Sequence, residues 1–267
     1  MRINACSVAF RHLSVTAADL DRYVAREGFD GLEIWAPHAR ALADDWCALP
    51  MRAPVPMLAG YLPLGLPGFA PDEACALLDL TRRWGAAQLR LFAGGTGSAA
   101  TPPAAQRAVR DDLARVADMA AARGLSVAIE THPGTLADGV EATLELLRAL
   151  DHPALVVNFD ALHVWESGAD PVAAFARLAP WVRHLHLKSV TGRDRLSVFA
   201  PDNIHDPQGD RRGICPLLEG APDWRPLLAA LPADMPASLE WFGPKPAATM
   251  AADLRVLRAL GAGARAA

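Results

Sequence analysis

The sequence predicts a single domain, residues 1–267, folded as a closed (β/α)8 barrel. Short apolar runs alternate with longer helical runs along the whole chain, and this order is typical of a parallel sheet. Eight such apolar runs and a length of 267 residues favour a closed barrel over an open sheet. No G-x-G-x-x-G motif follows the first run, so an open dinucleotide-binding sheet is not favoured.

Eight strands are expected, because each of these runs is short, apolar and rich in Val, Ile, Leu or aromatic residues. They are expected at Ile3–Ala9, Gly31–Trp35, Met57–Tyr61, Gln88–Phe92, Ser126–Glu130, Leu155–Asp160, Val182–Leu187 and Ala237–Trp241.

Helices are expected between the strands, because proline, serine or threonine precedes many of the helical runs and glycine ends several of them. The first begins after the caps Ser14 and Thr16 and ends at Gly28. The others are expected at Asp72–Trp84, Pro103–Arg123, Asp138–Leu150, Pro171–Leu178, Trp224–Leu231 and Ala247–Leu260. A long connection, 189–222, follows the seventh strand, and a loop of this length is expected to cover the active site.

The composition is that of a globular protein with a large core, since 52% of residues are hydrophobic and 21% are charged. The net charge of −4 and the lack of a Lys/Arg block do not favour binding to nucleic acid or to a membrane surface. No apolar run reaches the roughly 20 residues that span a bilayer, and the N-terminal stretch resembles a strand rather than a signal peptide. We therefore expect a cytoplasmic protein. Its four scattered cysteines lack a C-x-x-C pattern and are expected to be free thiols.

Polar side chains stand at the carboxyl ends of strands five to eight, where (β/α)8 barrels carry their chemistry. They are Glu130, Asp160, His186 and Glu240. Three carboxylates brought together in a buried site are costly, and a divalent cation removes that cost. Three oxygen donors and one imidazole predict a site for one divalent metal ion. The expected ion is Mn²⁺, with Mg²⁺ or Co²⁺ as alternatives. The other interpretation is that these are separate surface groups.

Further polar residues lie inside apolar strands. His184 and His186 share one face of the seventh strand, and His184 is expected to be a core histidine or to support the metal site. Lys188 lies on the same face, nearer the barrel mouth. It is expected either to bind an anionic substrate or to be a solvated lysine. Arg90 needs an anion or a carbonyl, and either a substrate carboxylate or Glu33 could supply it.

Several longer motifs carry a resemblance to a known family: "GLEIWAPH", "IETHPGTLADG", "NFDALHVWESGADP", "HLHLK" and "SLEWFG". The chain resembles the xylose-isomerase-like TIM-barrel superfamily of sugar isomerases and epimerases. It is more closely similar to the bacterial 3-dehydroshikimate dehydratases of the siderophore-biosynthesis type, which form protocatechuate. The resemblance extends from "CSVAFRH" near the N-terminus to "SLEWFG", and so covers most of the chain.

The resemblance implies roles for individual residues. It implies a divalent metal held by the four strand-end residues named above, and His132 as the acid/base group. It implies pocket positions at Tyr61, Arg90, His163 and Lys188, of which His163 and Lys188 are also expected to take part in catalysis. The long connection places His205 where the family is expected to have a tyrosine, so His205 is expected among the substrate-binding residues.

The activity implied is conversion of 3-dehydroshikimate to protocatechuate, with proton abstraction next to the ketone, stabilisation of an enediolate and loss of water. The alternative is a metal-dependent ketose epimerase or isomerase on the same barrel, in which Glu130 and Glu240 would move the proton. A metal-dependent nuclease is not favoured, because the chain is acidic. A non-catalytic barrel is not favoured either, because the ligand set is complete. The expected partner is a small anionic cyclic substrate, with no nucleic acid and no membrane. Such barrels often form homo-oligomers through their outer helices.

Overall fold

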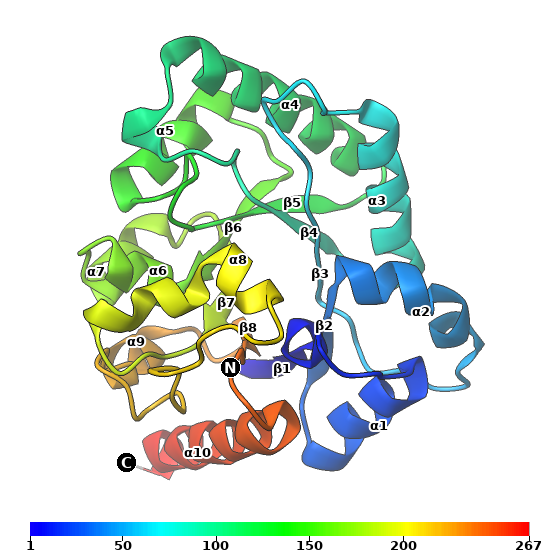
Figure 1. The fold of residues 1–267 in the computed structure, drawn as a ribbon, viewed down its shortest axis with the longest axis vertical. Coiled ribbons are helices and arrows are strands. Elements are labelled where there is room, and N and C mark those ends of the chain that lie inside the picture. The colour runs from blue at the N-terminus through cyan, green and yellow to red at the C-terminus, as the bar shows by residue number, and fades with distance from the viewer. Residues whose placement is uncertain (267) are drawn as a thin grey trace.

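The computed structural model describes residues 1–266, in which eight parallel strands form one closed barrel in chain order (Figure 1). The predicted (β/α)8 barrel is therefore confirmed. The strands are β1 (Arg2–Cys6), β2 (Gly31–Trp35), β3 (Met57–Ala59), β4 (Gln88–Leu91), β5 (Ser126–Glu130), β6 (Leu155–Asp160), β7 (Val182–Leu187) and β8 (Pro236–Leu239).

The helices surround the barrel (Figure 1). They are α1 (Ala17–Glu27), α2 (Ala36–Ala48), α3 (Pro71–Arg83), α4 (Pro103–Ala121), α5 (Val140–Leu150), α6 (Ala161–Glu166), α7 (Pro171–Leu178), α8 (Pro201–His205), α9 (Arg225–Ala230) and α10 (Pro246–Ala266). The sequence predicts the start and end of α1 well. Thr16 and Asp19 form a capping box at its start, and Gly28 ends it with a φ of 82°, which glycine adopts without strain.

Four strands, β2, β5, β6 and β7, have the predicted bounds. The other four, predicted at Ile3–Ala9, Met57–Tyr61, Gln88–Phe92 and Ala237–Trp241, are shorter at their carboxyl ends. The largest difference is in β1, which ends at Cys6 because Ser7–Phe10 forms a 3₁₀ helix.

Three helices, α2, α6 and α8, are not anticipated from the sequence. The helix α8 lies within the expected long connection, and α2 and α6 each begin directly where a strand ends. Pro37 lies in the first turn of α2, a position where proline is tolerated since its missing N–H has no helical partner. Asp160 caps α6, and its Oδ1 accepts a hydrogen bond of 3.1 Å from the His163 backbone N–H. One residue therefore ends β6, caps α6 and belongs to the predicted metal site.

The core has two parts. A large apolar layer packs the strands against the surrounding helices, and a small separate cluster consists of Met57, Ala128 and Val156 from β3, β5 and β6. All four cysteines are free thiols, as expected. Within residues 1–266, no helix combines the length and the apolar character that crossing a membrane requires.

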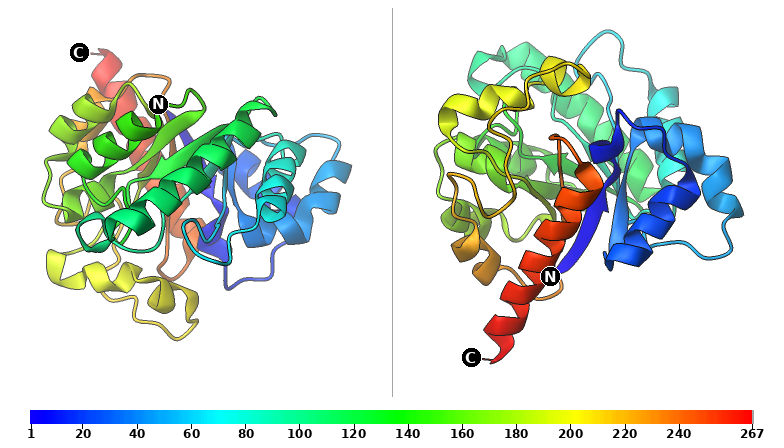
Figure 2. Two further views of the ribbon diagram at one scale, coloured as in Figure 1. Left: turned by 90° about the horizontal axis from the view of Figure 1, so that it is seen from above. Right: turned by 60° about the horizontal axis from the view of Figure 1, so that its bottom comes forward.

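The connection after β7 contains a 3₁₀ helix, η3 (Arg193–Phe199), followed by α8. In Figure 1 this yellow segment lies in front of the barrel strands, and Figure 2 (left) shows it projecting from one end of the molecule. Arg11, from the loop after β1, holds it in place. The Arg11 side chain donates to the carbonyl of Ile204 at 2.6 Å and to that of Phe242 at 3.1 Å.

A pH-dependent contribution to stability is expected from Asp253 on α10. Burial raises the pKa of this carboxyl to about 6, although its Oδ1 accepts a hydrogen bond of 3.1 Å from the Leu217 N–H. An unfolded aspartate has a pKa near 3.9, so between about pH 4 and 6 the folded state keeps a proton that the unfolded state loses. Relative to Asp253→Asn, the wild-type free energy of unfolding should fall by about 2 kcal/mol as the pH rises through this window.

Urea unfolding of both proteins at several pH values measures this difference. Asparagine keeps the acceptor for Leu217 and never ionises, so it isolates the charge. Parallel stability curves for the two proteins would contradict the prediction.

Candidate functional site

Four side chains converge at the carboxyl end of the barrel, from β5, β6, β7 and the residue after β8. Glu130, Asp160, His186 and Glu240 are all buried, and each offers a ligand atom within 4.8 Å of the others. Nδ1 of His186 lies 3.5 Å from Glu130 Oε2, 3.8 Å from Asp160 Oδ2 and 3.4 Å from Glu240 Oε2. These residues therefore form a group that could hold a divalent metal ion.

The chemistry of this group fits such an ion. Among the described residues, His186 Nδ1 has no hydrogen-bond partner although the side chain is fully buried. A cation between this nitrogen and the three carboxylates would satisfy the orphaned lone pair. Three oxygen donors and one imidazole, with no thiolate, match a hard to borderline divalent cation.

Two buried cations contact the same carboxylates. The Arg90 guanidinium Nε lies 3.0 Å from Glu130 Oε2, and Lys188 Nζ lies 2.7 Å from Glu240 Oε2 and contacts Asp160 Oδ2 as well. Burial alone would lower the pKa of Lys188, but these two carboxylates raise it. The sequence left the partner of Arg90 open between a substrate carboxylate and Glu33, and the structure shows Glu130 in that place.

Glu33 instead contacts the histidines of β7, from its position within β2. Nε2 of His186 lies 3.0 Å from each carboxylate oxygen of Glu33, and Nε2 of His184 lies 3.4 Å from Oε2. Burial alone would raise the pKa of Glu33, but the two imidazoles hold it well below its usual range. This contact does not follow from the sequence pattern, although an acid inside an apolar strand is a signal for a buried partner.

His132 follows β5 and is close to His163 of α6. Nδ1 of His132 donates to the carbonyl of Pro133 at 2.7 Å, and its ring centroid lies 4.4 Å from that of His163. Burial, together with the neighbouring His163, lowers the pKa of His132 to about 3. The imidazole is therefore neutral at physiological pH, with the Nε2 lone pair left to accept a proton.

His163 has a carboxylate partner of its own. Its Nδ1 lies 2.7 Å from Glu166 Oε2, one turn further along α6. A carboxylate in this position fixes the orientation of the ring and directs Nε2 towards the barrel interior. Glu166 is not predicted as a site residue from the sequence, because the helix that pairs it with His163 is not anticipated.

A small inner cavity of about 50 Å³ lies above the carboxylate cluster. Seven of the predicted site residues line it: Tyr61, Arg90, Glu130, His132, His163, Lys188 and Glu240. Phe199 and Ile204 of the segment after β7 also line it. An outer cavity of about 470 Å³ shares Phe92, His132, His163 and Phe199 with the inner one. Asp160 and His186 are fully buried and are not among the described residues that line the inner cavity.

His205 lies outside the wall of the inner cavity. Its ring stacks on Trp35, with centroids 5.9 Å apart and planes 16° apart. Trp35 in turn donates from its indole Nε1 to the hydroxyl of Tyr61 at 3.0 Å. Through Trp35, His205 is therefore connected to the predicted pocket residue Tyr61.

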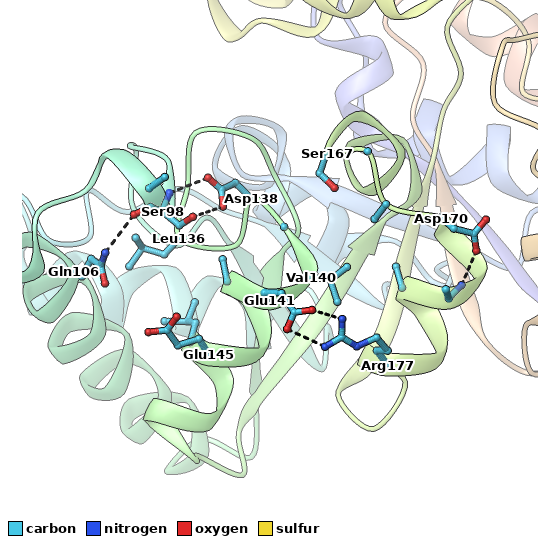
Figure 3. Close-up of a pocket in the computed structure, with 18 of the residues that line it drawn as sticks. Ser98, Gln106, Leu136, Asp138, Val140, Glu141, Glu145, Ser167, Asp170 and Arg177 are labelled. Atoms are coloured by element: carbon cyan, nitrogen blue, oxygen red, sulfur yellow. Dashed lines mark hydrogen bonds and ion pairs between the residues drawn. The ribbon is translucent and has the colours of Figure 1, made fainter.

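A larger cavity of about 810 Å³ lies on the outer surface and involves α4, α5 and α7 (Figure 3). Its polar groups largely pair with one another. Ser98 Oγ donates to Asp138 at 2.7 Å, and Arg177 forms an ion pair with Glu141. None of the predicted site residues is among the described residues that line it. The predicted site residues line the smaller cavities instead.

Residues 67–260 match a family model described as "Xylose isomerase-like TIM barrel". The chain belongs to this family. A 3-dehydroshikimate dehydratase of Bacillus anthracis is 34% identical to it over 270 residues, which cover 96% of this chain and 96% of that protein.

Solved structures of the xylose isomerase-like fold extend the likeness. The probable 3-DHS dehydratase AsbF, involved in petrobactin synthesis, from Bacillus anthracis has a TM-score of 0.89 and 32% identity, over 97% of this chain and 99% of that chain. The IOLI protein, solved with a bound zinc atom, has a TM-score of 0.73 over 98% of this chain and 96% of that chain. At 15% identity, its likeness shows the fold alone.

Proposed function

We propose that this protein is a metal-dependent 3-dehydroshikimate dehydratase that forms protocatechuate. The observation that carries the proposal is its similarity, over nearly the full length of both proteins, to the 3-dehydroshikimate dehydratase of Bacillus anthracis. The geometry supports it, since a candidate metal centre, a neutral histidine and two cations surround one small cavity.

In this proposal one divalent ion is held by Glu130, Asp160, His186 and Glu240. Mn²⁺ is the preferred ion, with Mg²⁺ or Co²⁺ as alternatives. When bound, the ion supplies Lewis-acid polarisation of the substrate ketone. The orphaned Nδ1 of His186 and the three facing carboxylates support this assignment. The Arg90 and Lys188 cations also form ion pairs with carboxylates of the cluster.

His132 is the proposed base. Its Nδ1–H is held by the Pro133 carbonyl, so the free Nε2 accepts the proton from the carbon next to the ketone. The ring hydroxyl in the β position to the ketone then leaves as water, after His132 or Lys188 has donated a proton to it. A second ring proton moves to oxygen and the ring becomes aromatic, so the net change is the loss of one water.

Arg90 and Lys188 line the cavity and favour a small anionic cyclic substrate. We include Tyr61, His163 and His205 as substrate-binding residues in the proposal, the last through its stack on Trp35. We further propose a cytoplasmic enzyme that acts without nucleic acid or membrane.

Glu166 should affect turnover through His163. Replacing the carboxylate by an amide in Glu166→Gln keeps the volume and removes the charge from a hydrogen bond of 2.7 Å to His163 Nδ1. A hydrogen bond to a charged group contributes about 1.4 kcal/mol more stabilisation than a neutral one. Loss of this difference in the transition state should lower kcat about tenfold. Steady-state kinetics and metal analysis measure the effect together. An unchanged kcat, or a loss of bound metal, would contradict this role.

A substrate comparison tests the proposed reaction against its alternative. The protein, supplied with Mn²⁺, is incubated with 3-dehydroshikimate and separately with a panel of ketoses, and products are identified by chromatography and mass spectrometry. Protocatechuate from the first and no epimer from the second is the expected result. Epimerised ketose without protocatechuate would favour the epimerase, in which Glu130 and Glu240 move the proton.

A further inference from the structure

We infer that Glu33 is a positioning residue for the metal centre: it fixes the tautomer and the orientation of His186, so that Nδ1 is presented to the metal. The inference rests on the metal site of the proposed function. Glu33 is 0% exposed and belongs to β2, far in sequence from the four proposed ligands. It takes no part in the proposed proton transfers.

The two nitrogens of His186 have different surroundings. Nε2 lies 3.0 Å from both oxygens of Glu33, and since a carboxylate only accepts, Nε2 carries the proton and donates it. Nδ1 faces Glu130, Asp160 and Glu240 and has no hydrogen-bond donor or acceptor of its own among the described residues. A neutral imidazole with its proton on Nε2 has its lone pair on Nδ1, directed at the proposed metal position.

An imidazole without such a partner distributes its proton between both nitrogens and can reorient. A carboxylate on the distal nitrogen removes this freedom and makes the ligating nitrogen more basic. Glu33 is well held for this task, because it is enclosed and because His184 also contacts its Oε2, at 3.4 Å.

His184, the other imidazole that contacts Glu33, has a second partner. His184 and Ser238 stand two residues before the proposed ligands His186 and Glu240 on their strands, and therefore one layer deeper in the barrel. Nε2 of His184 lies 2.8 Å from Ser238 Oγ, so His184 has a partner besides Glu33. Glu33 is the acceptor for His186 Nε2 among the described residues.

Metal affinity tests the inference without reference to turnover. The metal-free wild type, Glu33→Gln and Ser238→Ala are titrated with Mn²⁺ by calorimetry. Glu33→Gln should bind Mn²⁺ about 10–100-fold more weakly than the wild type, the usual effect of losing such a partner. Ser238→Ala removes a hydroxyl that contacts the His184 ring and leaves Glu33 in contact with His186 Nε2, so its affinity should stay within about twofold of the wild type.

A second measurement uses the wild type alone and does not depend on how well a variant folds. Imidazole ¹⁵N spectra of the zinc-loaded protein should show His186 protonated at Nε2 and metal-bound at Nδ1. A His186 bound through Nε2, or equal affinities of wild type and Glu33→Gln, would overturn this inference and leave the proposed reaction intact. A wild type that binds no metal would overturn both.

Discussion

Replacing His132 with alanine is expected to lower kcat for protocatechuate formation by about 10²–10⁴-fold, the usual contribution of a general base. The chain should keep its bound metal, because His132 lies beside the carboxylate cluster and is not one of its four members. Its position supports the base role: Nδ1 is occupied by the Pro133 carbonyl, burial keeps the ring neutral, and it lines the inner cavity.

The matched control for this experiment is His152→Ala. His152 hydrogen-bonds Asp118 at 3.2 Å on the outside of the barrel and should leave kcat unchanged. Initial rates and metal content are measured for all three proteins. If His132→Ala turns over at a rate close to that of the wild type, the proton is moved by another group, and the metal-bound carboxylates become the candidates.

The second large effect is expected from Glu240→Gln, which should weaken Mn²⁺ binding by more than about 100-fold, beyond the usual effect of losing a group that only supports a ligand. Glu240 is a better choice than Glu130, because Glu130 neutralises the buried guanidinium of Arg90. Removing that charge would leave Arg90 unpaired and threaten the fold. After Glu240→Gln, Lys188 still has Asp160 as its partner.

Metal analysis after gel filtration measures the change in occupancy, and thermal unfolding checks the fold. Glu141→Gln is a matched control, since Glu141 pairs with Arg177 at the surface cavity of about 810 Å³, whose described lining includes none of the four residues of the cluster. A Glu240→Gln protein that retains tightly bound metal at the wild-type level would remove Glu240 from the ligand set.

The sequence predicts the strands that carry the site particularly well. β5, β6 and β7 have the predicted bounds, because each is an apolar run that ends at a polar residue or a loop. The convergence of the four strand-end residues also follows from the sequence, since parallel strands of a closed barrel bring their carboxyl ends together. Residues that lie at equivalent ends of neighbouring strands can thus be grouped from the sequence alone.

The pairing of charged side chains inside the barrel could not be predicted in the same way. A charged residue inside an apolar strand signals a buried partner, but not which of several strands provides it. Arg90 contacts Glu130 and Glu33 contacts His186, although the sequence had suggested that Arg90 and Glu33 could pair. The choice depends on barrel closure and on the depth of each side chain, which are tertiary properties.

The sequence pattern also does not predict the helices that begin at strand ends or the structure of the segment after β7. The α6 helix starts on Asp160 with no intervening loop, so the pairing of His163 with Glu166 was hidden. The place of His205 depends on the stack with Trp35 and on the hold of Arg11 on Ile204. Both contacts join segments that are remote in sequence.

The rate of protocatechuate formation from 3-dehydroshikimate, measured as Mn²⁺ is added stepwise to chelator-treated protein, tests the proposed reaction most directly. The rate should be negligible without metal, rise in proportion to added Mn²⁺, and level off at one ion per chain. A protein that binds one Mn²⁺ per chain and yields no protocatechuate, or one that forms it equally fast in excess chelator, would contradict the proposal.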